Sequence, residues 1–180
     1  MDRLRIWYYV GDGFDWLESH GRVIGVTRVT VELLYAAFEN REKFDIIPCV
    51  LAGSGHALAP VGLPETLAYF AAKTGKPLPS NSPAAPALPK ALQSAPGLVP
   101  KAGDHVLFTG IVWTSRYIAL FDRLAAQGVE FSAFVHDIIP VEPPDLVPDE
   151  THRMFATWLK TVVNSPERNS GANENVFDNQ

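Results

Sequence analysis

The chain has 180 residues, of which 47% are hydrophobic and 19% are charged, a composition typical of a globular domain and not of a disordered chain. Its length fits one domain with a sizeable core. The net charge of -5 and the lack of a dense Lys/Arg stripe argue against a nucleic-acid surface, so we expect no nucleic-acid partner. The single cysteine, Cys49, excludes a disulfide framework and a thiolate metal site within this sequence.

The amino-terminal segment contains no long apolar run. After Met1–Arg5, only five further apolar residues follow, from Ile6 to Val10, which is too few for a signal peptide or a membrane span. We therefore expect a cytoplasmic protein, and peripheral contact with the inner face of a membrane stays open.

The first predicted strand runs from Leu4 to Val10 and is aromatic and β-branched. We expect residues 11–25 to form a loop, because four glycines in this stretch permit tight backbone turns. Gly11-Asp12-Gly13 resembles the start of a dinucleotide-binding fingerprint. We reject that interpretation, since Trp16 replaces the third glycine and no helix is expected directly behind the motif.

The first predicted helix covers Thr27–Phe38, with Thr27 as its N-cap. Gly25 and Thr27 place a flexible turn beside a helix N-terminus, where free N–H groups attract anions and hydroxyl-rich ligands. An ordinary loop-to-helix junction is the alternative interpretation of the same residues.

The second predicted strand, Phe44–Leu51, contains Pro48, which cannot donate a ladder hydrogen bond. We therefore expect this strand to be short, or to lie at a sheet edge near Pro48. The order strand, helix, strand implies parallel pairing. A helix over Leu63–Thr74 follows, with Pro64 in its first turn.

Residues 76–103 are rich in proline and nearly uncharged, which indicates a long insertion loop outside the core. The alternation of strand and helix then resumes. The remaining predicted elements are strands over His105–Thr109 and Phe131–Val135 and helices over Ser115–Gln127 and Asp149–Asn164. The aromatic stripe of the last helix is expected to pack into the core.

His136 and Asp137 directly follow the fourth predicted strand. In an open α/β sheet, ligands bind at the carboxyl ends of the strands, and a His-Asp pair there can donate, accept or carry a proton near neutral pH. The same two residues also fit a loop histidine and an aspartate that caps the next turn.

Two segments together resemble family-4 retaining glycosyltransferases. Residues 25–34, GVTRVTVELL, are similar to that family's glycine-rich, arginine-containing helix start, and residues 135–140, VHDIIP, are similar to its His-Asp-hydrophobic-Pro stretch. The two motifs, with their order and separation, span the chain from about Leu4 to Asn164.

The resemblance implies one half of a GT-B fold: a single Rossmann-like α/β domain with a mainly parallel sheet flanked by helices, over residues 1–164. It also implies roles for individual residues. His136 and Asp137 would be catalytic, with His136 hydrogen-bonded to the transferred sugar, and substrate would contact Gly11, Gly25, Val26, Thr27, Arg28 and Gly110. Family members use a nucleotide sugar as co-substrate and need no metal or other cofactor.

This sequence departs from the family pattern in two places. Val26-Thr27 stands where the family has a small-residue pair, and the domain that would bind the donor is not found in the chain. Residues 165–180 are polar and rich in asparagine, so we expect a disordered tail there.

The function expected from these features is acceptor binding in a sugar-transfer enzyme, with a glycan or lipid-linked acceptor and no activity without the donor-binding domain. A second hypothesis is a non-catalytic module that pairs with a separate donor-binding chain or self-associates. A third, a small hydrolase or nucleotide-dependent enzyme, is disfavoured because the sequence has no nucleophile elbow or Walker loop.

Overall fold

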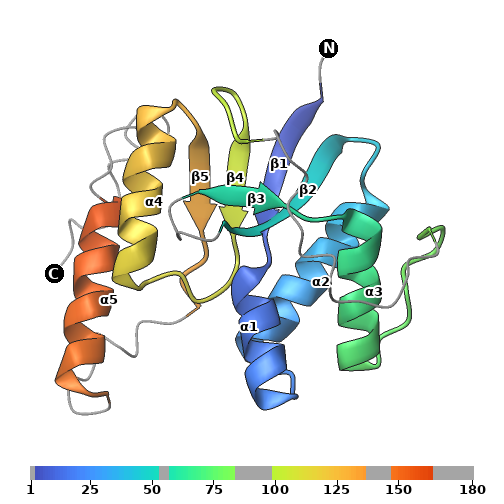
Figure 1. The fold of residues 1–180 in the computed structure, drawn as a ribbon, viewed down its shortest axis with the longest axis horizontal. Coiled ribbons are helices and arrows are strands. Elements are labelled where there is room, and N and C mark those ends of the chain that lie inside the picture. Colours follow the sequence, from blue (N-terminus) through green and yellow to red (C-terminus); the bar gives the residue numbers. More distant parts are fainter. Residues whose placement is uncertain (1–2, 53–56, 84–98, 137–146, 164–180) are drawn as a thin grey trace, which may run out of the picture.

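The computed structural model describes residues 3–52, 57–83, 99–136 and 147–163, which form a Rossmann-like α/β domain (Figure 1). The strands are β1 (Leu4–Tyr9), β2 (Phe44–Leu51), β3 (Leu58–Pro60), β4 (His105–Phe108) and β5 (Glu130–Ala133). The helices are α1 (Gly11–His20), α2 (Gly25–Glu39), α3 (Leu63–Thr74), α4 (Ser115–Ala126) and α5 (Asp149–Val163). The predicted Rossmann-like α/β domain is therefore confirmed.

The strands form one sheet in the order β3-β2-β1-β4-β5. The pairs β1–β2, β1–β4 and β4–β5 are parallel, and only β3 runs antiparallel, against β2. The chain first adds β2 and β3 on one side of β1. It then returns and adds β4 and β5 on the other side of β1. The direction of winding thus reverses between β1 and β4, which is where open α/β sheets form their ligand crevice.

The helices cover both faces of the sheet (Figure 1). The side chains of β1 point alternately to the two faces. Trp7 and Tyr9 point into a cluster with the buried side chains of α4 and α5. Tyr8 and Val10 point into a second cluster formed with α1, α2 and α3. In α5, Phe155 and Trp158 are buried in the first cluster, so the prediction that this aromatic stripe belongs to the core is confirmed.

The predicted loop over residues 11–25 is wrong, because a helix, α1, opens immediately after β1. Phe14 and Leu17, three positions apart, are buried against Val10 and the neighbouring helices. This burial outweighs the loss of helix stability caused by Gly11 and Gly13, about 1 kcal/mol each. A Cβ at Gly11 would overlap the Tyr9 hydroxyl, so packing itself requires glycine at the start of this helix.

β2 is not short: it has eight residues and lies between β1 and β3. The carbonyl of Cys49 accepts from Val10 N–H at 2.9 Å, and that of Pro48 accepts from Val61 N–H at 2.8 Å. The backbone N–H and C=O groups of successive β2 residues therefore point alternately to β1 and to β3. The N–H that Pro48 lacks would point to β3. There the ladder pairs only Cys49–Leu51, and the sequence analysis missed the three-residue strand β3.

The start of α2 also differs from the prediction. The helix begins at Gly25, its N-cap is Ile24, and no side chain caps it. Thr27 is not the N-cap but a buried residue of the first turn. Asp137, most of the proline-rich insertion (84–98) and the tail (165–180) lie outside the described residues. No helix in the described part of the chain is long and apolar enough to cross a membrane.

The assignment of α1 as a core helix predicts that Leu17→Ala lowers the free energy of unfolding by about 2–5 kcal/mol, because Leu17 is fully buried. Ser19→Ala, an exposed position of the same helix, should change it by less than about 0.5 kcal/mol. Urea unfolding followed by circular dichroism measures both. Equal, small effects would contradict the helix and restore the loop.

Candidate functional site

The loops that follow β1 and β4 meet at the point where the sheet reverses its winding. Asp12, in the first turn of α1, accepts a hydrogen bond from the backbone N–H of Ile111 through Oδ2, at 2.9 Å. This bond joins the carboxyl ends of the two strands. A Cβ at Gly110 would overlap the Asp12 carboxylate, so Gly110 has to be glycine for the bond to form. The predicted contact residue Gly110 is thus a packing residue beneath Asp12.

His136 is attached to the same end of β4 from the other side. Its Nε2 lies 2.7 Å from the carbonyl oxygen of Thr109. A carbonyl only accepts, so Nε2 carries the proton, and in the neutral ring Nδ1 is then an acceptor. The side chain is exposed, and an external group can therefore reach it.

A buried hydroxyl network connects this end of β4 to α2. The Oγ1 of Thr109 donates to Oγ1 of Thr30 at 3.1 Å, and the Tyr8 hydroxyl lies 3.1 Å from Thr109 Oγ1 and 2.8 Å from the Thr30 carbonyl. Thr30 Oγ1 in turn bonds the carbonyl of Val26 at 3.3 Å. The first turn of α2 and the end of β4 are therefore held in a fixed relation.

A pocket of about 250 Å³ opens between these elements. Its walls come from α1, the start of α2 and the segment after β4. The lining residues are Asp12, Asp15, Trp16, Ser19, His20, Ile24, Val26, Thr27, Ile111 and Arg116. Two predicted site residues, Val26 and Thr27, thus line a real cavity. Sequence reasoning missed Asp12, Trp16 and Arg116.

The aromatic wall of the pocket is rigid. Trp16 stacks on His20 with ring centroids 3.8 Å apart, and its Nε1 donates to the carbonyl of Arg22 at 2.9 Å. Because the ring is held by both contacts, it presents an ordered surface and loses little entropy when a ligand packs on it.

The cationic group of the pocket is already engaged. Arg116 Nη2 donates to the Tyr117 hydroxyl at 2.9 Å and lies 3.8 Å from Oδ2 of Asp15. The hydroxyls of Tyr117 and Tyr9 are 2.9 Å apart beneath it. Arg116 thus contacts Tyr117 and Asp15, and a diphosphate would find no further arginine or lysine on the described lining.

The Asp12 carboxyl is electrostatically unusual. Burial raises its pKa, and the amides of Ile111, Gly13 and Asp12 itself only partly oppose that effect. Its second oxygen, Oδ1, is buried and has no hydrogen-bond partner among the described residues. A buried acceptor without a partner costs free energy, about 1–3 kcal/mol, so it calls for an explanation.

The other predicted site residues take different places. Gly11 is a packing residue over Tyr9, as described above. Gly25 is exposed with open space where a Cβ would lie, and Arg28 is exposed and is not among the described residues of the pocket wall. His136 lies across Thr109 from the pocket and not inside it, and Asp137 is not described.

The signal for Asp12 was present in the sequence, because an aspartate between two glycines directly follows a buried strand. Nothing local marked Trp16 or Arg116. No group of three or more His, Cys, Asp or Glu side chains in the described part of the chain could hold a metal ion.

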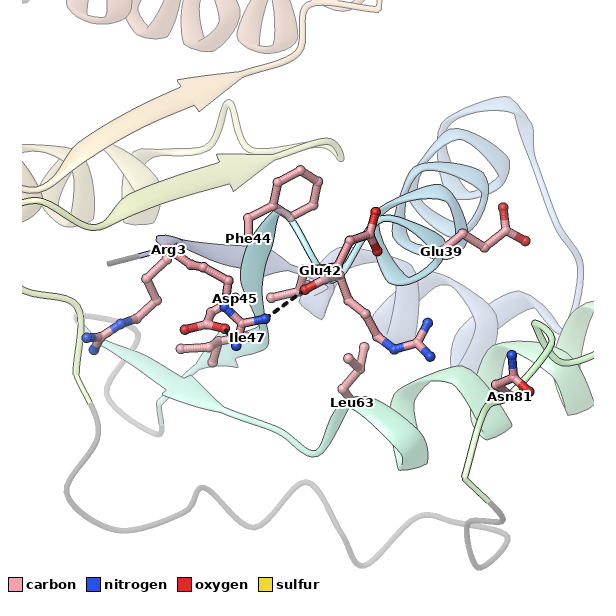
Figure 2. A pocket seen from close by; sticks show the side chains of 11 residues that line it. Arg3, Glu39, Glu42, Phe44, Asp45, Ile47, Leu63 and Asn81 are labelled. Carbon is pink, nitrogen blue, oxygen red and sulfur yellow. Dashed lines mark hydrogen bonds and ion pairs between the residues drawn. The ribbon is translucent and has the colours of Figure 1, made fainter. Parts of the chain in front are cut away.

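A second hollow, of about 1050 Å³, lies at the opposite, amino-terminal edge of the strands (Figure 2). Two of its arginines form ion pairs: Arg3 lies 2.7 Å from Asp45, within the lining, and Arg5 lies 3.4 Å from Asp104, outside it. Arg41 stacks over Phe38 at 4.2 Å. We therefore place the candidate site at the carboxyl edge, where the unpaired carboxylate oxygen and the predicted motifs occur.

No protein-family model, curated protein or solved structure matches this chain. The function of the pocket is therefore argued from its geometry and from the sequence motifs that border it.

The two glycines nearest the site should respond differently to alanine. Gly110→Ala should lower the free energy of unfolding by about 1–3 kcal/mol, because the new methyl group displaces the Asp12 carboxylate. Gly25→Ala should leave it unchanged or raise it by up to about 1 kcal/mol, since the position is open. Chemical denaturation tests the pair, and equal losses would contradict the packing.

The raised pKa of Asp12 predicts a pH dependence of stability. The folded state disfavours the ionised carboxylate. The contribution of Asp12 to the free energy of unfolding is therefore greatest at acid pH, and it is lost as the pH rises through the pKa of the folded state. Asp12→Asn should therefore gain stability relative to the wild type as the pH is raised from about 4 to about 8. Urea unfolding across that range measures the difference, and parallel curves would contradict the assignment.

Proposed function

We propose that this chain is the acceptor-binding domain of a retaining glycosyltransferase of the GT-B type. In the complete enzyme a nucleotide sugar would supply the transferred sugar, and a glycan or a lipid-linked saccharide would receive it. The donor's diphosphate would be held by residues of a separate donor-binding domain or partner chain, so the 180-residue chain alone would not catalyse transfer.

The observation that supports this proposal most is the link between the two motifs. His136 bonds Thr109, Thr109 bonds Thr30, and Thr30 bonds the Val26 carbonyl. Residues more than a hundred positions apart in the sequence thus share one edge of the sheet. Had they occupied opposite edges, the resemblance would have no chemical meaning.

The chemistry of the pocket favours a neutral, hydroxyl-rich ligand over a nucleotide diphosphate. A diphosphate needs several converging cations or free helix amides. Here the described lining holds one arginine, which contacts Tyr117 and Asp15, and two carboxyl side chains, Asp12 and Asp15, beside the uncapped start of α2, so the balance of charged side chains disfavours a diphosphate. This arrangement suits the acceptor side of a sugar-transfer reaction.

In this proposal His136 contacts the transferred sugar at the same edge of the sheet as the pocket. Its Nδ1 would accept a hydrogen bond from a sugar hydroxyl while Thr109 fixes the ring orientation through Nε2. The imidazole would thereby hold the donor sugar next to the acceptor, which lowers the entropic part of the barrier.

A non-catalytic assembly module is the second candidate, favoured by one observation. Phe134 and Val135, just before His136, have exposed fractions of 44% and 42%. Exposed apolar side chains next to His136, just after β5, would suit a docking partner chain. Size-exclusion chromatography tests self-association: a dimer that Phe134→Ser disperses would favour this candidate, whereas a monomer with saccharide affinity would favour acceptor binding.

The proposed function predicts that the isolated chain binds saccharides but does not turn over nucleotide sugars. A titration with oligosaccharide and lipid-linked saccharide acceptors, followed by NMR, should shift the amides of Val26, Thr27 and Ile111, which border the pocket. The ring signal of His136 should also move, because it lies beside Thr109. Product analysis with a panel of nucleotide sugars should detect no transfer.

His105 provides the internal control, because it begins β4 at the opposite edge of the sheet. Its ring signal should stay in place throughout the titration. Transfer by the isolated chain, or shifts confined to the hollow around Arg3 and Arg41, would overturn the proposal.

A further inference from the structure

Asp15 and Arg116 form a charged pair on the wall of the pocket at the carboxyl edge of the sheet. Nη2 of Arg116 lies 3.8 Å from Oδ2 of Asp15, beyond the usual N–H···O hydrogen-bond range of about 2.7–3.2 Å. This contact therefore uses little of the hydrogen-bonding capacity of either group. The exposed fractions of the side chains are 73% for Asp15 and 51% for Arg116, so a ligand in the pocket can reach both.

The guanidinium of Arg116 is held in place by Tyr117. Nη2 donates to the Tyr117 hydroxyl at 2.9 Å, and the guanidinium carbon lies 4.9 Å from the centroid of the same ring, a cation–π contact. The Tyr117 hydroxyl is in turn 2.9 Å from the hydroxyl of Tyr9. Because a guanidinium has five N–H donors, Arg116 keeps donors for a ligand and loses little entropy when it binds one.

The spacing of the charged pair favours a neutral hydroxyl as the ligand group. A hydroxyl oxygen about 2.8 Å from both atoms fits a gap of 3.8 Å, and it can donate its proton to Asp15 while it accepts from Arg116. Asp15 would repel an anion, and Arg116 would repel a cation. An amino-acid zwitterion would have to separate the two side chains in order to pair with each, whereas a hydroxyl fits them as they stand.

The rest of the pocket has the size and lining of a site for one small ring. Its volume of about 250 Å³ is below the range of drug-sized pockets, roughly 300–1,000 Å³. Trp16 and His20, with ring centroids 3.8 Å apart, form an aromatic wall, and Ile24 and Val26 add apolar surface. Apolar walls with a few precisely placed polar groups match a sugar ring, which presents both C–H faces and hydroxyl edges.

We propose that this pocket binds one neutral sugar ring of the acceptor, and that a hydroxyl of that ring bridges Asp15 and Arg116. The proposal rests on the function proposed above and extends it, because it names two specificity-determining residues and the size of the recognised unit. Both side chains contact the ligand directly, and Tyr117 acts through Arg116 by fixing its orientation.

The test is a double-substitution cycle on the binding of methyl glycosides of glucose, galactose, mannose and N-acetylglucosamine. Saturation-transfer NMR and titrations should show that at least one glycoside binds the wild type. Asp15→Ala and Arg116→Ala should each raise its dissociation constant about tenfold, the effect of losing one hydrogen bond to a charged group. The double variant should lose no more than either single variant, because either substitution already breaks the bridge.

Asp122→Ala and Arg123→Ala are the matched controls. They remove the same charges from exposed positions of α4, the helix of Arg116, and both positions lie outside the described lining. Their dissociation constants should stay within threefold of the wild-type value, and the melting temperatures of all variants should show that they are folded. Alanine and methyl glucuronide, a zwitterion and an anion, should bind the wild type more weakly than the neutral glycoside.

Three results would overturn the inference. Losses that multiply in the double variant would show two separate contacts and no bridging hydroxyl. Equal losses in the control variants would make net charge the cause. Unchanged glycoside binding in Asp15→Ala, with the amide shifts at Val26 and Thr27 retained, would overturn the inference and leave the acceptor-domain proposal standing. A wild type that binds no saccharide at all would overturn both proposals.

Discussion

The structure depends on the way the end of β4 is fastened to its two neighbours. On one side the Ile111 amide bonds Asp12, which follows β1, and on the other the Thr109 carbonyl bonds His136, which follows β5. Parallel strands bring these ends to one edge of the sheet, but they do not fix the conformation of the loops that follow. Two backbone groups, separated by Gly110, supply that constraint. Gly110 is suited to it because any side chain would occupy the space of the Asp12 carboxylate.

Much of the fold can be predicted because its signals are local and strong. Leu63–Thr74 is predicted with the bounds that the structure shows, since Pro64 and Gly75 punctuate an apolar stripe. The failure at α1 has a physical cause. Gly11 and Gly13 disfavour a helix locally, and for Gly11 the close packing against Tyr9, which the sequence cannot display, explains why a glycine is there. The strand β3 escapes prediction because three residues are too few to show a period.

The candidate site is only partly predictable for a similar reason. Val26 and Thr27 are found from their place at the start of a helix, whereas Arg116 enters the pocket because α4 follows the segment that contacts α1, a long-range relation without a local signature. His136 is predicted at the carboxyl edge of the sheet because it follows a strand, and there it bonds Thr109 at the end of β4. Its role in catalysis, like the roles of the other motif residues, is a proposal that rests on a resemblance and on this shared edge.

The segment Thr109–Gly110–Ile111 has a consequence for how two substrates would meet on this domain. It is a short covalent path between the Asp12 carboxylate and the His136 imidazole, and each group is tied directly to it. A change in the conformation of this three-residue segment would therefore alter the hydrogen bonds of both groups. In the proposed sugar-transfer enzyme, the pocket that meets the acceptor and the side chain that meets the transferred sugar would thus be joined through one short stretch of backbone.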